Sequence, residues 1–151
     1  MSRREQIRMS DEEVLALLDE ERTVICATNG RRGWPHLMPL WYVVGDGELR
    51  GWTYAKSQKA RNLERDPRAT IGIEEGVEYQ ELRGVMIECD VEVEREHERV
   101  AEYGYALVER YAGGAEAAKE AFREQARKRV GLIFRPARIV SWDHRKLGGL
   151  Y

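Results

Sequence analysis

The sequence predicts a mainly β domain with helices, in which antiparallel strands form a closed barrel and the helices pack outside it. The prediction rests on the order of the segments: a helix, five strands with one short helix among them, two more helices and a final pair of strands. A chain of 151 residues is long enough for one domain that buries roughly 70% of its unfolded surface. We therefore expect a single domain over residues 1–151.

The first helix begins at a capping box formed by Ser10 and Glu13. A stripe of valine and leucine follows, and the helix is expected to end near Glu21. Residues 23–29 are rich in β-branched and small apolar side chains and predict a strand that stops at an Asn-Gly turn. Residues 34–44 predict a second strand, whose two prolines indicate a sheet edge, a bend or a bulge.

The remaining elements follow from the same patterns. Further strands are predicted over residues 48–55, 68–74, 82–94, 130–136 and 137–143, and helices over residues 57–66, 96–111 and 115–129. Pro67 ends the short helix, and Pro136 marks the corner between the last two strands. The glycine-rich tail from His144 onward predicts a loop.

Composition excludes several classes of function. The 25 basic and 27 acidic residues give a net charge of −2, which argues against a general nucleic-acid binder. No apolar run approaches the roughly 18 residues of a membrane span, and the N-terminus lacks the apolar stretch of a signal peptide, so we expect a cytoplasmic protein. Cys26 and Cys89 are expected to be free, buried thiols. The three scattered histidines supply too few ligands for a metal site.

The segment TYAKSQKARN, residues 53–62, places several cations at the junction of a strand and a helix. Ser57 is a good N-cap, and Lys56, Lys59 and Arg61 surround a helix N-terminus whose free N–H groups attract anions. Cations at this end disfavour the isolated helix, and a bound phosphate would relieve that conflict. Two interpretations stay open, a phosphate cradle and a solvated turn, and in both Lys59 is expected to be an exposed side chain.

Several motifs carry a resemblance to a known family. They are Pro-Leu-Trp-Tyr in the second strand, Lys-Ser-Gln-Lys after the third, Arg-Asn-Leu followed by Arg-Asp-Pro-Arg-Ala, and the closing SWDHRKLGG. Residues 38–74 resemble the central segment of the pyridoxamine 5′-phosphate oxidase-like split β-barrel flavoproteins. They resemble more closely the flavin/deazaflavin oxidoreductase branch, many members of which use coenzyme F420. The resemblance extends over residues 10–149.

The resemblance implies a split β-barrel, FMN-binding-like fold that forms a homodimer with two cofactors at its interface. The phosphate would rest on the Lys-Ser-Gln-Lys stretch, the ring would be held by the two flanking strands, and the closing segment around His144 would reach the partner's site. The cofactor-binding residues that it implies, together with the nearby cation Arg61, are Met38, Pro39, Leu40, Trp41, Thr53, Tyr54, Ala55, Lys56, Ser57, Gln58, Lys59, Arg61, Tyr79, Gln80, Trp142 and Lys146.

The sequence shows no paired carboxylates suited to acid–base catalysis, so it identifies no catalytic residue. The resemblance implies hydride transfer from reduced F420 to a small electron-poor acceptor, with the chemistry carried by the cofactor. FMN is the alternative cofactor. The acidic tail of F420 requires a positive surface, which Arg31 and Arg32 could extend. The arginine-rich C-terminal motif of true pyridoxamine phosphate oxidases is not recognisable in DHRKLGGLY, which argues against that activity.

A non-catalytic carrier of F420, FMN or haem would need the same cradle and stays open, as does a family member that has lost its cofactor. Some of the named residues also have a purely structural interpretation. Trp41 could be a core or interface aromatic, and Tyr79 could be a packing residue. Arg65, His36 and His144 are expected to be ordinary surface residues.

Overall fold

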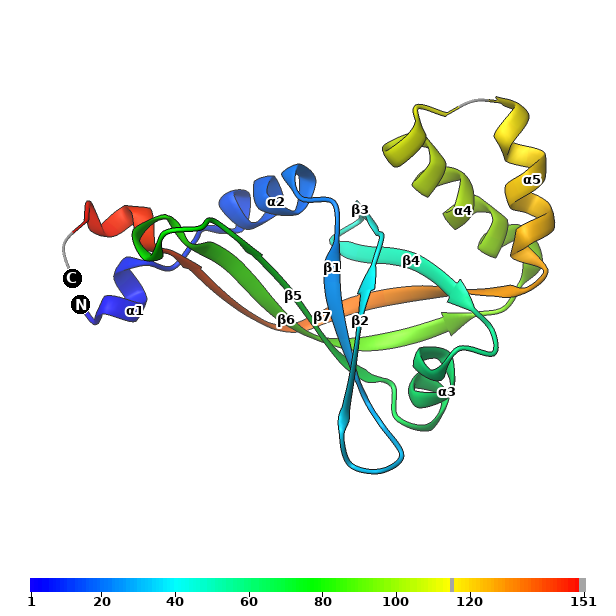
Figure 1. The fold of residues 1–151 in the computed structure, drawn as a ribbon, viewed down its shortest axis with the longest axis horizontal. Coiled ribbons are helices and arrows are strands. Elements are labelled where there is room, and N and C mark those ends of the chain that lie inside the picture. Colours follow the sequence, from blue (N-terminus) through cyan, green and yellow to red (C-terminus); the bar gives the residue numbers. More distant parts are fainter. Residues whose placement is uncertain (115, 150–151) are drawn as a thin grey trace.

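A single curled, antiparallel sheet of seven strands forms the centre of the protein (Figure 1). The computed structural model describes residues 1–114 and 116–149. Hydrogen-bonded neighbours follow the order β2-β1-β5-β6-β7-β4-β3. The strands are β1 (Val24–Asn29), β2 (Pro35–Leu40), β3 (Val43–Gly45), β4 (Glu48–Tyr54), β5 (Arg68–Glu75), β6 (Arg83–Glu94) and β7 (Arg129–Asp143).

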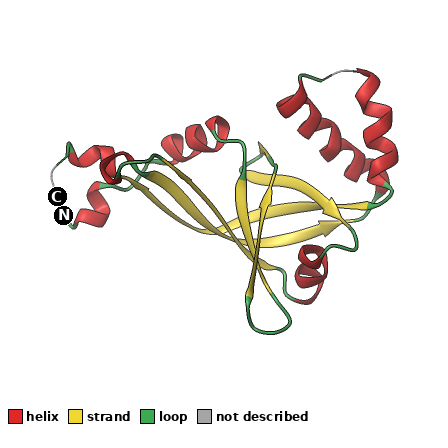
Figure 2. Cartoon of the chain, in the orientation of Figure 1, coloured by secondary structure: helices red, strands yellow, loops and turns green. Residues whose placement is uncertain are grey.

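Helices lie at both ends of this sheet and along its sides (Figure 2). They are α1 (Arg3–Gln6), α2 (Asp11–Glu20), α3 (Gln58–Arg65), α4 (His97–Ala112) and α5 (Glu116–Ala126), with short 3-10 helices η1 (Tyr79–Glu81) and η2 (His144–Leu147). Helices α4 and α5 pair at the end opposite to α1 and η2 (Figure 1). None of the helices in the described ranges combines the length and apolar character needed to span a bilayer.

The expected closed barrel is corrected to a half-barrel, because β2 and β3 are the two edges of the sheet and do not pair with each other. Pro35 and Pro39 both lie in β2, as expected for residues that donate no backbone hydrogen bond. The end of β2 crosses β4 closely: a Cβ on Gly51 would lie 2.9 Å from the Trp41 carbonyl oxygen. A close backbone contact, not strand pairing, therefore joins the segment that follows β2 to β4.

Two predicted strand boundaries were wrong. The predicted strand 34–44 is two strands, because the buried Tyr42 turns inward and its hydroxyl donates to the carbonyls of Leu18 (2.7 Å) and Glu21 (2.9 Å). The predicted pair 130–136 and 137–143 is the single 15-residue strand β7. A bulge at Ala137 absorbs the irregularity, since Pro136 pairs with Cys89 and Arg138 with Glu88.

The ends of the chain hold more structure than the sequence indicated. Helix α1 has its own capping box at Ser2, and the tail expected to be a loop forms η2. The two elements contact each other, since the Asp143 amide donates to the Ile7 carbonyl. The predicted helix start at Ala115 lies outside the described residues.

Buried hydrophobic residues form two clusters. The large one packs on the sheet, and the smaller one lies between α4, α5 and β4. Helix α2 buries Val14, Leu17 and Leu18 against the large cluster. Cys26 and Cys89 are free and buried there, as predicted. Burial raises their thiol pKa values to about 11 and about 12.

One arginine joins α4 to the end of α2. The Arg110 guanidinium donates to the carbonyls of Tyr42 (2.6 Å), Leu18 (2.8 Å), Asp19 (3.2 Å) and Glu21 (2.7 Å). Carbonyls in the last turn of a helix have no intrahelical partner and attract cations. The same guanidinium lies 4.4 Å from the centre of the Tyr42 ring. Arg110 thus fixes the position of α4 relative to the connection between β2 and β3.

The contact between α4 and β4 generates a stability prediction. A Cβ at Gly104 would lie 2.6 Å from the Trp52 ring, and Trp52 cannot retreat because Phe122 stacks on it. We expect Gly104→Ala to cost about 1–3 kcal/mol through overpacking, more than the helix-propensity gain of up to about 1 kcal/mol. Urea denaturation measures the loss. Gly45→Ala is the control, because an added Cβ meets nothing within 4 Å there; equal effects of both changes would contradict the prediction.

Candidate functional site

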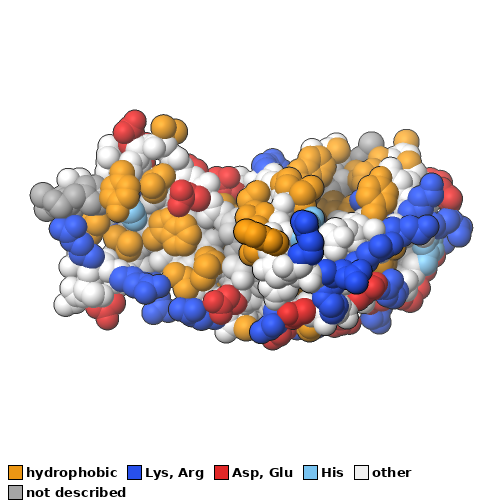
Figure 3. All heavy atoms as spheres, turned by 60° about the horizontal axis from the view of Figure 1, so that its bottom comes forward, with side chains coloured by type: hydrophobic (Ala, Val, Ile, Leu, Met, Phe, Trp, Pro, Cys, Tyr) orange, Lys and Arg blue, Asp and Glu red, His pale blue; other side chains and the backbone are white. Residues whose placement is uncertain are grey.

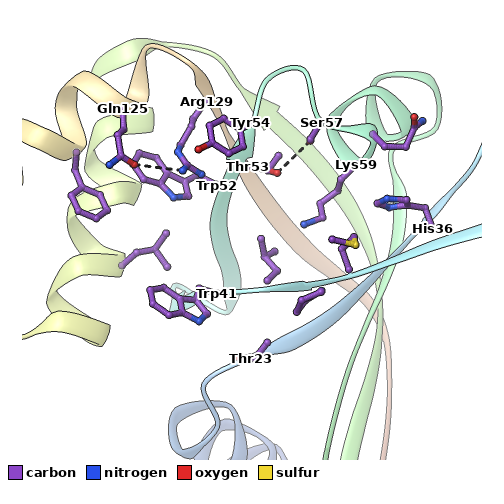
Figure 4. Close-up of a pocket in the computed structure, with 16 residues that line it drawn as sticks. Thr23, His36, Trp41, Trp52, Thr53, Tyr54, Ser57, Lys59, Gln125 and Arg129 are labelled. Atoms are coloured by element: carbon purple, nitrogen blue, oxygen red, sulfur yellow. Dashed lines mark hydrogen bonds between the residues drawn. The ribbon is translucent and has the colours of Figure 1, made fainter.

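A cavity of about 700 Å³ opens between β2, β4, the start of α3 and the α4–α5 pair (Figure 4). Hydrophobic side chains border a hollow in the right half of Figure 3, and Lys and Arg side chains form a band beside it. The predicted cofactor-binding residues that line the cavity are Met38, Pro39, Leu40, Trp41, Thr53, Tyr54, Ser57, Gln58 and Lys59. The structure therefore gathers residues from two separate segments, 38–41 and 53–59, around one space.

The start of α3 presents unpaired donors to this cavity. Ser57 caps the helix, since its hydroxyl accepts from the Ala60 amide at 3.1 Å and from the Thr53 hydroxyl at 3.3 Å. The amide N–H groups of Gln58 and Lys59 have no partner in the described ranges. A capped helix N-terminus with two free N–H groups is suited to hold a phosphate.

Lys59 is buried, which corrects the expectation of an exposed side chain. Only 6% of Lys59 is exposed, and its ammonium points into the cavity (Figure 4). No described residue forms an ion pair or hydrogen bond with this ammonium. Burial lowers the pKa of Lys59, an effect that the nearby Cys26 partly opposes. A buried cation without a carboxylate is unfavourable until an anion arrives.

Asn62 and Arg65 hold α3 in place. Asn62 is fully buried and donates to the Thr28 hydroxyl of β1 at 3.0 Å. Arg65 is exposed, as expected, and it also donates to the Asn29 carbonyl at 2.6 Å, which links α3 to β1. These bonds fix the direction in which the helix N-terminus points.

The cavity walls are aromatic. Trp41 stacks on Tyr111 of α4, with ring centres 4.3 Å apart. Trp52, which was not predicted as a site residue, stacks on Phe122 of α5 at 5.5 Å. Trp41 remains 56% exposed despite this contact, so much of its surface is available to a ligand. The walls are suited to a flat molecule, because planar rings stack favourably on aromatic faces.

Arg129 and Gln125 are two further lining residues that the sequence did not reveal. Arg129 pairs with Tyr54 across the β4–β7 ladder, a contact between residues far apart in the chain. Its guanidinium lies 4.5 Å from the Trp52 ring centre and 4.2 Å from the Tyr54 ring centre. Nothing in the local sequence around Arg129 indicates this role, since only the strand pairing brings it to the cavity.

His36 also lines the cavity, from strand β2. It is half-buried, and its Nδ1 is buried without a hydrogen-bond partner in the described ranges. His36 is therefore a partly exposed residue of the cavity wall, which the expectation of an ordinary surface histidine did not include. Among the described lining residues there is no aspartate or glutamate, and no group of His, Cys, Asp and Glu side chains in the described part of the chain could hold a metal ion.

Three predicted residues lie beside the cavity without lining it. Lys56 and Arg61 are exposed, and Ala55 packs partly buried against the core. Lys56 and Arg61 can therefore add positive charge near the cradle, but they do not contact the enclosed space.

The remaining predicted residues lie near the opposite end of the same chain, around η1 and η2 (Figure 1). Gln80 belongs to η1 with Tyr79, whose ring packs edge-on against His144 at 4.7 Å. Trp142 donates to Glu74 at 3.2 Å, and Lys146 donates to Glu13 at 2.6 Å. Within one chain these residues do not meet the cavity. Their contact with a partner's cofactor stays a prediction.

Comparison with known proteins shows the family to which the chain belongs. Residues 10–143 match the family model described as "Pyridoxamine 5'-phosphate oxidase". A conserved hypothetical protein from Mycobacterium tuberculosis is 41% identical, with a TM-score of 0.91 over 100% of this chain and 95% of that one. No similar protein was found among curated proteins.

Two more distant structures share the fold alone. One is an F420 reductase, 21% identical with a TM-score of 0.69, over 86% of this chain and 98% of the other. The other is the haem storage protein HutZ from Vibrio cholerae, 17% identical with a TM-score of 0.69, over 87% and 94% of the two chains.

The buried ammonium of Lys59 generates a second stability prediction. Its lowered pKa means that the folded state disfavours the charged form, so the destabilisation is present at neutral pH and shrinks as pH rises toward the unfolded pKa. Lys59→Met keeps the apolar stem and removes the charge. We expect the cofactor-free protein to gain about 1 kcal/mol, roughly 2–4 °C in Tm.

Thermal unfolding of the cofactor-free protein at neutral pH measures this gain. Lys56→Met is the matched control, because Lys56 is exposed and its loss should change stability by less than about 0.5 kcal/mol. A lower Tm for Lys59→Met than for wild type would show that the ammonium has a stabilising partner.

Proposed function

The chain belongs to the pyridoxamine 5′-phosphate oxidase family, and on this premise we propose that it is an F420-dependent oxidoreductase. Reduced F420 would deliver a hydride to a small electron-poor acceptor, and a proton from solvent would complete the reduction. The observation that carries the proposal is the buried, unpartnered Lys59 beside the capped N-terminus of α3. An anion at this point would satisfy Lys59 and two free amides together.

The lining residues fit a phosphate-bearing, ring-containing cofactor. Ser57, Gln58 and Lys59 would hold the phosphate. The segment from Met38 to Trp41 and the end of β4 would hold the ring between them, as their position on the cavity wall suggests. F420, when bound, supplies the hydride, and the protein orients the two reactants and excludes water.

A second hollow favours F420 over FMN. It is lined by Arg31, Arg32 and Trp34 at the tip of the β1–β2 hairpin, and it shares His36 and Gln58 with the main cavity. Neither arginine has a carboxylate partner in the described ranges. The acidic tail of F420 would find a continuous positive path from the cradle to the hairpin, whereas FMN has no tail to place there.

We further propose that the protein acts as a homodimer with the cofactor at the interface. Leu37, Trp41 and Tyr54 are 57%, 56% and 57% exposed, which leaves apolar side chains on and beside the cavity rim without cover. Light scattering tests this proposal through the molar mass in solution. A stable monomer at all concentrations would contradict it.

A non-catalytic cofactor carrier is the second candidate. One observation favours it: the described lining residues include no aspartate or glutamate that could act as a general acid. Turnover separates the two candidates. A carrier binds F420 but does not oxidise the reduced form faster when acceptors such as quinones or enones are added, whereas an oxidoreductase does.

A fluorescence titration tests the cofactor directly. We expect the cofactor-free protein to bind F420 more tightly than FMN, because only F420 reaches Arg31 and Arg32. Lys59→Ala should weaken F420 binding by about 1–3 kcal/mol, the range for a lost charge-assisted hydrogen bond. Arg138→Ala is a control, because Arg138 pairs with Glu88 outside the cavity. A dissociation constant unchanged by Lys59→Ala would exclude the cradle.

Binding should also depend on pH. Lys59 attracts an anion only while it is protonated, and burial lowers its pKa. We therefore expect F420 affinity to fall with rising pH in an alkaline range that begins below the ordinary lysine pKa of about 10.4. Lys59→Arg, which stays charged, should remove this fall. Titrations at a series of pH values measure it, and parallel profiles for the two proteins would contradict the assignment.

A further inference from the structure

Arg129 stands at a different part of the cavity from Lys59. Figure 4 shows Arg129 beside Trp52 and Gln125, and Lys59 beside Thr53 and Ser57. The two cations therefore flank the segment of β4 that the proposed function assigns to the cofactor ring. Arg129 therefore offers this cavity a cation separate from the one at the proposed phosphate site.

The Arg129 guanidinium is positioned without an ionic partner. The rings of Trp52 and Tyr54 lie 4.5 Å and 4.2 Å from it. No described carboxylate pairs with it, its Nε is buried without a hydrogen-bond partner, and Nη2 has only a long 3.5 Å contact with Gln125. Aromatic faces hold the charge in place while most of its donors stay unused.

Other arginines nearby show the contrast. Arg127, two residues earlier, pairs with Glu124 at 2.9 Å. Arg123 on α5 pairs with Glu98 at 2.8 Å. Arg129 lacks such a partner although carboxylates pair with these two neighbours, so its guanidinium on the cavity wall is available to an external anion.

Apolar side chains line the same cavity as Arg129. Trp52, Phe122 and Leu107 come from β4, α5 and α4, and all three line the cavity. A molecule that contacts Arg129 must therefore also lie against an aromatic and aliphatic wall. This combination selects a planar apolar body that carries an anionic group.

We propose that Arg129 is a specificity residue that binds a carboxylate, and that the acceptor is a planar, aromatic or conjugated carboxylic acid. The inference rests on the proposed function, because it assigns the acceptor side of the same cavity. Gln125 supplies a second polar group beside the guanidinium (Figure 4). Phe122, half-buried and stacked on Trp52, offers an aromatic surface to the ring of the acceptor.

The test compares a planar acid with its uncharged ester. The probes are 2-naphthoate and methyl 2-naphthoate, titrated by calorimetry into wild type, Arg129→Gln, Arg129→Lys and the control Arg127→Gln. We expect wild type and Arg127→Gln to bind the acid at least about tenfold more tightly than the ester, the size of one charge-assisted hydrogen bond. Arg129→Gln should abolish this preference, and Arg129→Lys should retain part of it.

The ratio of acid to ester affinity distinguishes a role of Arg129 in binding the carboxylate from a purely structural role. If Arg129 only supports Trp52, its loss weakens acid and ester equally and leaves the ratio unchanged, which overturns the proposal. No saturable binding of naphthoate at millimolar concentration also overturns it. Naphthoate binding that is lost in Lys59→Ala but kept in Arg129→Gln would place the acid in the cradle, with the same consequence.

Parallel F420 titrations keep this test distinct from that of the proposed function. We expect Lys59→Ala to weaken F420 and spare naphthoate, and Arg129→Gln to do the reverse. Failure of wild type to bind F420 defeats the proposed function while the naphthoate ratio still measures the anion site. F420 binding that is lost equally in both variants would make Arg129 a cofactor residue and overturn the acceptor assignment.

Discussion

The hydrogen bonds from Arg110 to the end of α2 are the constraint on which the rest of the structure depends. They satisfy carbonyls of Leu18, Asp19 and Glu21 that no helix partner can reach, and they include the Tyr42 carbonyl between β2 and β3. The two edge strands, β2 and β3, do not hydrogen-bond to each other, so the contacts of Arg110 take the place of strand pairing. The same hydrogen bonds place Tyr111 against Trp41, and this contact positions one wall of the cavity.

Stability and function oppose each other in the cavity. Lys59 and Arg129 both line it without a carboxylate partner in the described ranges, although 27 acidic residues are available in the chain. Several other arginines form ion pairs, as Arg135 does with Glu48 and Glu92. Unpaired cations in an apolar cavity destabilise the ligand-free protein. They become favourable when an anionic ligand binds and pairs with them.

Local patterns predicted much of the fold because they depend on short-range physics. Capping at Ser10 and Ser57 was confirmed by hydrogen bonds to the Glu13 and Ala60 amides. The prolines of β2 indicated an edge, a bend or a bulge, and β2 is an edge strand. Boundaries failed where a tertiary contact overrode a local preference, as when burial of Tyr42 divided one predicted strand into two, and when a bulge carried β7 past Pro136.

The sequence by itself determined most of the longer elements, the free buried cysteines and the position of the helix N-terminus with its cations, since each depends on residues close together in the chain. Only the tertiary structure decided that Lys59 is buried, that Arg65 is a structural link and that Arg129 reaches the cavity. These outcomes depend on which strands become neighbours, because burial and desolvation are set by residues from distant segments. The pairing of β4 with β7 joins Tyr54 to Arg129, and no local pattern contains that information.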